Sequence, residues 1–305
     1  MLEISAAVCS HNSRPNFLAR VMEALRNQTL PKERWELLVI DNASKAPLES
    51  TWDLSWHPNA RHIAESKLGV AFARQRAIRE AAADLLIFID DDNVLDNNYF
   101  SEALKIKYNW PVLGVWGSGS IVPDYEIVPS QCLQEFTYLL ALRETTSPRW
   151  SNVPSCSDAM PWGAGLCVRA SVMSAYRQFF EQSPIQIVGR QGDTLFAGED
   201  NEISLICCKE GLGMGVFPEL KLTHLIPKER VTERHIVKLA EGAGMGGLLL
   251  NYKWDAVVPP SPISVRGLLS AIRTILLRRR IDRLMHFAWI RARIKARNII
   301  RQTQM

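Results

Sequence analysis

Long apolar runs are missing from this sequence of 305 residues. No stretch of 18 consecutive apolar residues occurs, so we expect no transmembrane helix. The N-terminal segment Met1–Ile4 lacks the basic region and the extended apolar stretch of a secretory signal, and it leads almost at once into a strand-like segment. These absences predict a cytoplasmic protein.

Cysteine patterns typical of zinc sites or disulfide frameworks are also missing. None of the cysteines forms a CxxC pair, so we expect reduced thiols that serve mostly as small core residues. We find no internal repeat either. The six cysteines are Cys9, Cys132, Cys156, Cys167, Cys207 and Cys208.

Acidic residues are almost absent from the C-terminal segment. Eleven of the 36 Lys and Arg but one of the 32 acids lie in residues 261–305, so this segment has a net charge of +10 and the preceding 260 residues one of −6. Apolar residues recur at helical spacing between Val265 and Leu276, which predicts a basic amphipathic helix. Such a helix binds an anionic membrane surface; the alternative is a helix packed on the domain with its basic face in solvent. No aromatic interleaving supports a nucleic-acid partner.

The first hundred residues alternate between strand and helix patterns. Strands are expected at residues 4–9, 35–40, 61–64 and 85–89, and helices from Pro15 and over about 69–82. This βαβαβ order predicts a mostly parallel, Rossmann-like sheet with helices on both faces.

The later pattern is looser. Residues 144–161, rich in Ser, Thr and Pro, are expected to form a mobile loop, and a helix over 232–241 is expected to end at the glycines that follow it. Pro259, Pro260 and Pro262 indicate a linker to the basic tail. Further strands are expected at 112–116, 163–168 and 213–217, and further helices at 172–180 and 199–209.

Three consecutive carboxylates follow the most apolar strand. Asp90, Asp91 and Asp92 come directly after the run Leu85–Ile89, at the end of a strand buried on both faces. Open α/β sheets bind ligands at this edge. Adjacent carboxylates repel one another unless a cation lies among them, and Mg²⁺ or Mn²⁺ prefers such oxygen ligands together with substrate phosphates. The triplet therefore indicates a metal that holds a phosphorylated substrate; an acidic turn or helix cap is the alternative.

Six segments recur in a familiar order and at plausible separations. They are Ala7–Pro15, Val39–Ser44, Gly69–Arg74, Phe88–Asp92, Trp162–Gly165 and Gly198–Asp200. Taken together they resemble the family 2 glycosyltransferases, enzymes with the GT-A fold, and the resemblance covers residues 3 to 225. It implies an inverting enzyme of polysaccharide biosynthesis that transfers a sugar from a nucleotide diphospho-sugar, UDP-linked, to a hydroxyl of a glycan or lipid-linked acceptor.

The resemblance assigns a group of residues to the nucleotide-sugar. His11 would stack on the base, unless it caps the helix that begins at Pro15. Asp41 would accept a hydrogen bond from a base N–H, unless it only forms a turn. Arg74 would bind phosphate beside a helix N-terminus, and Asp91 would contact the ribose or the sugar. The full set is Cys9, Ser10, His11, Asn12, Asp41, Lys67, Gly69, Arg74, Asp90 and Asp91.

The same resemblance implies a divalent cation, Mn²⁺ or Mg²⁺, and a general base. Asp92 matches the last position of the family's D-x-D pattern and would bind the metal, with Asp90 as a ligand or its support. His224 would be a further ligand, although a lone histidine is more often structural. Asp200 would deprotonate the acceptor hydroxyl with Glu199 as its neighbour; two acids favoured by a helix dipole are the alternative.

The acceptor and the domain limits complete the prediction. Trp162, Gly163, Ala164 and Gly165 would line the acceptor and sugar site, unless Trp162 is a core residue. Residues 1–258 would form the GT-A domain, with a nucleotide-binding half (1–95) and an acceptor half (96–258), and residues 259–305 the linker and basic tail.

Two other functions compete with this reading. A sugar-phosphate nucleotidyltransferase usually has a glycine-rich basic loop after its first strand, and residues 9–14 contain no glycine. A non-catalytic protein that binds an anionic membrane through its tail leaves the acids at the sheet edge unexplained. We expect a cytoplasmic glycosyltransferase, with its tail on the inner face of the membrane as the further hypothesis.

Overall fold

The structure is a computed structural model, and it describes residues 1–190, 196–261 and 279–303. The chain divides into two compact units, each built from three stretches of sequence. Unit 1 comprises Met1–Tyr125, Ala141–Gln182 and Asp200–Ile226. Unit 2 comprises Glu126–Leu140, Ser183–Glu199 and Pro227–Met305. The predicted functional halves, 1–95 and 96–258, stay a prediction.

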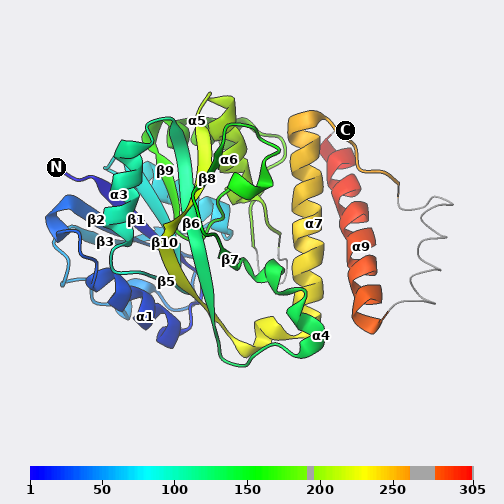
Figure 1. Ribbon diagram of the computed structural model, residues 1–305, viewed down its shortest axis with the longest axis horizontal. Coiled ribbons are helices and arrows are strands. Elements are labelled where there is room, and N and C mark those ends of the chain that lie inside the picture. Colours follow the sequence, from blue (N-terminus) through cyan, green and yellow to red (C-terminus); the bar gives the residue numbers. More distant parts are fainter. Residues whose placement is uncertain (191–195, 262–278, 304–305) are drawn as a thin grey trace. The chain divides into compact units, whose positions relative to one another are not determined.

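Unit 1 is built on a ten-stranded mixed sheet, shown in Figure 1, with strand order β3-β2-β1-β4-β9-β6-β10-β5. The first four strands of this order are parallel to one another, as the βαβ pattern predicts. Their side chains are almost all buried, in keeping with the continuous apolar runs in the sequence. The four strands are β1 (Ile4–Ser10), β2 (Trp35–Asn42), β3 (Ala60–Glu65) and β4 (Leu85–Asp90).

The rest of the sheet is mixed. β9 (Leu166–Arg169) runs antiparallel to both β4 and β6 and so joins the two parts. The long strands β6 (Leu113–Tyr125) and β10 (Gly213–Ile226) are parallel neighbours. Three short strands complete it: β5 (Asn93–Leu95) and β8 (Arg149–Ser151), both on β10, and β7 (Arg143–Glu144) on β6.

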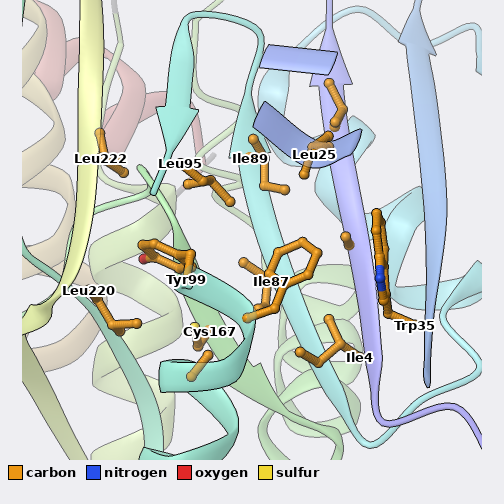
Figure 2. Close-up of a cluster of buried hydrophobic side chains, with 14 of the residues drawn as sticks. Ile4, Leu25, Trp35, Ile87, Ile89, Leu95, Tyr99, Cys167, Leu220 and Leu222 are labelled. Carbon is orange, nitrogen blue, oxygen red and sulfur yellow. The ribbon is translucent and has the colours of Figure 1, made fainter. Parts of the chain in front are cut away.

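Helices cover both faces of this sheet. Alternate residues of β1, β2 and β4 form the core that Figure 2 shows, together with side chains of α1 and α3 such as Leu25 and Tyr99. On the other face, α2 packs on β1, β2 and β3 and also on α5. The helices are α1 (Pro15–Arg26), α2 (Val70–Glu80), α3 (Tyr99–Asn109), α5 (Ala170–Gln182) and α6 (Glu199–Lys209), which begins with the candidate base motif.

The predicted start and apolar stripe of α1 are confirmed. Pro15 occupies its first turn, and the residues at helical spacing are buried. The mobile loop expected at 144–161 is only partly correct, because this segment contains β8 and a 3-10 turn at Ser157–Ala159. The strand expected at 213–217 continues as β10 to Ile226, beyond an irregularity in register between Phe217 and Lys221.

Unit 2 contains a pair of packed helices, α7 (Glu233–Asp255) and α9 (Arg280–Thr303), preceded by the short α4 (Gln131–Gln134). The expectation that glycines end the first helix near residue 241 is wrong. α7 continues through them because buried Gly244 gives room to α9: a Cβ there would lie 2.9 Å from the Trp289 ring.

The basic tail contains α9, but the predicted apolar stripe at 265–276 lies outside the described residues. α9 buries six residues, three of them alanines at every fourth position. Among the residues that the structure describes, no helix has the length and apolarity to span a bilayer.

Candidate active site

Most of the predicted donor residues lie together where three parallel strands of unit 1 end. Strand register places Ser10 beside Asp41 and Cys9 beside Asp90. Because these strands are adjacent and parallel, the loops that follow them meet at one edge of the sheet, as predicted. Burial raises the pKa of the Cys9 thiol to about 12, so this cysteine remains a neutral thiol beside the site.

The His11 ring is held by both of its nitrogens. Nδ1 donates to the carbonyl oxygen of Asn42 at 2.7 Å, and Nε2 accepts from the Asn12 amide at 2.8 Å, a pairing that fits the neutral Nδ1–H tautomer. α1 has no side-chain cap at its start, so the alternative that His11 caps this helix is wrong. The edges of the ring are engaged, which leaves its faces for stacking.

The Asp41 carboxylate binds its own loop. Oδ1 accepts from the backbone N–H of Ser44 at 3.0 Å and Oδ2 from that of Leu48 at 2.9 Å. Asp41 therefore does stabilise the turn that follows β2, as the alternative interpretation predicted. A carboxylate oxygen has more than one lone pair, so a base N–H can bind there as well. The base-reading role of Asp41 stays a prediction.

Asn42 was missed as a site residue, although it is part of the family-like segment. It is buried, and its side-chain amide donates to the carbonyl oxygens of Lys67 at 2.6 Å and Glu65 at 3.3 Å. Its side-chain oxygen accepts from the N–H of Gly69 at 2.9 Å. Asn42 thus ties the ends of β1, β2 and β3 together; no sequence pattern reveals this, because its partners lie more than twenty residues away.

The turn into α2 carries the candidate phosphate-binding groups. Gly69 precedes the helix with φ = 139°, a backbone conformation that favours glycine. The Arg74 guanidinium is buried and lies 3.7 Å from Oδ1 of Asp90. The Lys67 ammonium lies 5.7 Å from the centre of the Phe72 ring. The helix N-terminus and two cations make this corner favourable for an anion.

The three aspartates of the triplet have separate surroundings. Asp90 pairs with Arg74, and Asp91 accepts a hydrogen bond from the Ser10 hydroxyl at 2.7 Å. Asp92 is buried; its Oδ1 accepts from the Asn93 amide at 3.0 Å, and its Oδ2 lies 3.5 Å from Nε2 of His224. His224 lies in β10, which pairs with β5. This pairing places His224 opposite Asn93, the residue after Asp92.

Asp92 and His224 fit a divalent cation as a partial ligand set. Two neighbouring ligands of an octahedral Mg²⁺, each about 2.1 Å from the ion, are about 3 Å apart, close to the observed separation of Oδ2 and Nε2. Among the described residues no group of three or more His, Cys, Asp or Glu surrounds one point. The protein would supply few ligands and the substrate phosphates the others, as is usual for Mg²⁺.

Asp200 is held beside the predicted acceptor segment. Its Oδ2 accepts from the Gly163 N–H at 2.8 Å, and its Oδ1 from the Asn201 N–H at 2.9 Å. Gly163 also packs on Arg74, because a Cβ there would lie 2.2 Å from Nη2 of that arginine. One glycine therefore contacts both the candidate base and a candidate phosphate-binding residue. Glu199 is buried at the start of the same helix.

The Trp162–Gly165 segment divides into two parts. Ala164 and Gly165 are packed in the sheet interior, where the Tyr99 hydroxyl donates to the Gly165 carbonyl at 2.7 Å, so their contribution is structural. Trp162 is half-buried, and its ring lies under the Arg143 guanidinium, whose Cζ is 3.9 Å from the ring centre. Arg143 was also missed, because nothing in the local sequence indicates its neighbours.

A hollow lies beside β7. Its volume is about 430 Å³. Its lining is mostly polar and includes Glu144, the residue after Arg143. None of the predicted site residues lines it. The lining residues are Ser120, Glu144, Thr145, Pro218, Glu219 and Lys221.

A family model decides the class of protein. The model for glycosyl transferase family 2 matches residues 5–156. The chain belongs to glycosyl transferase family 2. The match includes the loop with His11, Asp41, Arg74 and the aspartate triplet of this glycosyltransferase. Membership of this family argues against the two competing functions, a sugar-phosphate nucleotidyltransferase and a non-catalytic membrane-binding protein.

Solved structures of S. aureus TarS share the fold. TarS 1-349 in complex with UDP superposes with a TM-score of 0.51 at 14% identity, over 99% of this chain and 92% of that chain. A second structure of TarS 1-349 gives 0.49 with the same identity and coverage. The likeness to the UDP complex confirms the predicted GT-A fold of this family 2 glycosyltransferase. No curated protein sequence matches the chain.

Proposed function

We propose that this glycosyltransferase moves a sugar from a UDP-linked donor to a hydroxyl of a glycan or lipid-linked acceptor, with inversion at the anomeric carbon. The family supports sugar transfer, and the TarS structure with this fold was solved with UDP. At the end of the parallel strands, His11 would stack on the base and Asp41 would accept from it. Arg74 and the N-terminus of α2 would bind the diphosphate.

A divalent metal fits the described residues. Asp92 and His224 would hold Mn²⁺ or Mg²⁺, with Asp90 as a ligand or support. When bound, the metal would neutralise the charge that develops on the diphosphate leaving group. Asp91, paired with Ser10, is left to contact the ribose or the donor sugar.

Asp200 would act as the general base. It takes the proton from the acceptor hydroxyl while that oxygen attacks the anomeric carbon and the bond to the diphosphate oxygen breaks. A single displacement of this kind inverts the anomeric configuration. The Gly163 N–H fixes one oxygen of the base, so the carboxylate is oriented before the acceptor arrives.

One observation carries the proposal. Asp90, Arg74, Gly163 and Asp200 are linked by consecutive contacts, so the candidate phosphate-binding groups and the candidate base meet at one glycine. An inverting transfer needs both groups close together, because the leaving diphosphate and the attacking hydroxyl act on the same anomeric carbon.

The donor and the metal are tested by binding. Thermal unfolding is followed with UDP-GlcNAc, UDP-glucose, UDP-galactose and GDP-mannose, each with Mn²⁺ and with EDTA. A donor at a hundredfold excess over its Kd stabilises the native state by about 2.7 kcal/mol, so we expect one UDP-sugar to raise Tm with Mn²⁺ and much less with EDTA. Asp92→Ala should lose this dependence on Mn²⁺. Asp84→Ala, at the opposite end of β4, is the matched control, and equal Mn²⁺ responses of the two variants would contradict the metal assignment.

The base is tested by turnover. UDP release from the stabilising donor should fall about 10²- to 10⁴-fold in Asp200→Asn, because the amide cannot accept the proton. Donor affinity should change little. Wild-type turnover in this variant would rule out Asp200 as the base.

We also propose that the basic C-terminal segment contacts an anionic membrane surface. Its net charge of +10 supports this proposal. Part of the charge is compensated within unit 2, because Arg291 and Lys295 bind Glu241 at 2.6 and 2.7 Å. Binding would therefore depend on the remaining basic residues, among them Arg293 and Arg301.

Variants that replace a basic side chain with a neutral one test this contact better than deletion of the segment, because deletion would remove residues of α9 that are buried against α7. Arg293→Gln/Arg301→Gln should sediment less with vesicles that contain a third phosphatidylserine than the wild type does. Arg20→Gln/Lys105→Gln, with the same loss of charge in unit 1, is the control. Equal sedimentation of both double variants would contradict a specific role of the tail.

A further inference from the structure

Arg143 makes two contacts that hold the Met160–Gly163 segment. Its guanidinium lies over the Trp162 ring, with Cζ 3.9 Å from the ring centre, and its Nη2 donates to the carbonyl oxygen of Met160 at 2.9 Å. A cation over an indole ring is attracted by the ring quadrupole, most strongly where water is excluded. Strand β7 brings Arg143 to this place by pairing it with buried Ile121 of β6.

The charge of Arg143 reaches Asp200. Burial lowers the pKa of the guanidinium to about 10, and the carboxylates of Asp158 and Asp200 oppose this shift while Arg149 adds to it. A pKa near 10 leaves the group almost fully charged at neutral pH. Its Nη1 is buried and has no hydrogen-bond partner among the described residues, so this donor is not consumed by the surrounding protein.

The segment that Arg143 holds is the one that orients the candidate base. The N–H of Gly163 donates to Oδ2 of Asp200, and the Cα of Gly163 packs on the guanidinium of Arg74. The segment is therefore held between two arginines, Arg74 on the side of Asp90 and Arg143 on the side of Trp162. A shift of Trp162 would move the Gly163 N–H and with it the carboxylate of Asp200.

We propose that Arg143 is a positioning residue for the reaction: it fixes the Trp162–Gly163 peptide that orients Asp200. This inference rests on the proposed function, in which Asp200 accepts the proton. It assigns a catalytic consequence to a residue that does not touch the reacting atoms. A purely structural arginine would affect stability and leave the kcat of the folded enzyme unchanged.

The test measures UDP release from UDP-GlcNAc with Mn²⁺ at pH 7.5, in which water takes the place of the acceptor. Arg143→Gln should lower kcat at least tenfold and leave the Kd for UDP within twofold. Arg143→Lys keeps a cation beside Trp162 and should restore part of the rate. Arg149→Gln removes a neighbouring, exposed charge and should behave as wild type.

Two further measurements separate positioning from misfolding. The thermal midpoint and the Kd for UDP show whether unit 1 is intact in each variant. In Asp200→Asn, adding Arg143→Gln should change kcat less than twofold, because Arg143 acts through a carboxylate that is already gone. A full tenfold further loss would overturn the inference.

The outcomes distinguish this inference from the proposed function. If the wild type is active and Arg143→Gln has the same kcat, the role of Arg143 alone is overturned. A change confined to the Kd for UDP would do the same, because it places Arg143 at the donor. If neither UDP-GlcNAc nor the other nucleotide-sugars yields turnover, the proposed function fails and the inference fails with it.

Discussion

At the scale of single residues, the candidate site is held mainly by backbone groups. Asp41, Asn42 and Asp200 each bind main-chain N–H groups of segments distant in sequence or of their own loops. Such bonds fix a side chain without using another one, so they set the orientation of the site before a ligand binds. The rigidity of this edge therefore depends on few side chains.

Asn42 allows a direct test of this dependence. Asn42→Ala leaves the Gly69 N–H and the Lys67 carbonyl without a buried partner, and we expect a loss of about 1–3 kcal/mol in the free energy of unfolding. The KM for the donor should rise about tenfold with a smaller change in kcat, because the loops that would hold the nucleotide separate. Urea unfolding and initial-rate kinetics measure both effects.

The chemistry of this position gives the control. Asn42→Asp keeps the shape but cannot donate to the carbonyl oxygens of Glu65 and Lys67, so it should be no better than alanine. Asn27→Ala, at an exposed asparagine, should be close to wild type. If Asn42→Asp restored the wild-type KM, the hydrogen bonds that the Asn42 amide donates would not matter for binding of the nucleotide-sugar.

The residues of the site were predictable to different degrees. His11, Asp41 and the triplet stand at strand ends, and Arg74 lies in the helix that follows β3; the order of strands in a parallel sheet brings these strand ends together. The contacts of Arg143 and the hydrogen bonds of Asn42 were not predictable, because their partners lie far away in the sequence. Their positions depend on tertiary packing, which local patterns do not record.

At the scale of elements, glycine was the residue most easily misread. Each glycine in a helix costs about 1 kcal/mol relative to alanine, which predicts an interruption after residue 241. Packing overrides this cost in α7, because buried Gly244 and Gly246 let neighbouring segments approach the helix. In β10 the predicted strand ended at Phe217, yet pairing with β6 resumes at Lys221, beyond Pro218.

Two adjacent glycines of α7 should respond oppositely to alanine. A Cβ at Gly246 would lie 1.8 Å from the carbonyl oxygen of Ala197, so Gly246→Ala must displace that backbone and should cost about 1–3 kcal/mol of stability. Ala197 lies three residues before Asp200, so turnover should fall as well. Urea unfolding and UDP release measure the two effects.

Gly247 is the matched control. It is exposed, and a Cβ there would meet nothing within 4 Å, so Gly247→Ala should stabilise α7 by up to about 1 kcal/mol. Equal stability changes in the two variants would mean that the close approach of Ala197 does not determine the glycine at position 246.

At the scale of the whole molecule, charge and burial decide how the protein responds to its surroundings. The asymmetry between an acidic body and a basic tail was predictable from the sequence. The local compensation of that charge was not, because it required knowing that α9 packs beside α7 and faces Glu241. The burial of histidines is a second property that depends on tertiary packing.

Two histidines link the stability of the molecule to pH. Burial lowers the pKa of His57 to about 4 from its usual 6.5, and burial with nearby arginines lowers that of His235 to about 4. The unfolded chain therefore binds more protons between pH 6.5 and 4, so stability is fully present above pH 6.5 and decreases as the pH falls through this window. For His57 the full loss is at most about 3 kcal/mol.

The His57 ring lies 4.0 Å from that of Trp35, so tryptophan fluorescence reports its surroundings directly. Urea unfolding of wild type at pH 7.5, 6.5, 5.5 and 4.5 should give a falling free energy, with a slope of up to about 1.4 kcal/mol per pH unit for each histidine. His57→Gln keeps an acceptor for the Asn59 N–H that now binds Nδ1. It should be less stable at pH 7.5 yet lose less on acidification. If its dependence on pH equals that of wild type, His57 does not carry the linkage, and the protonation of other groups must account for the acid sensitivity.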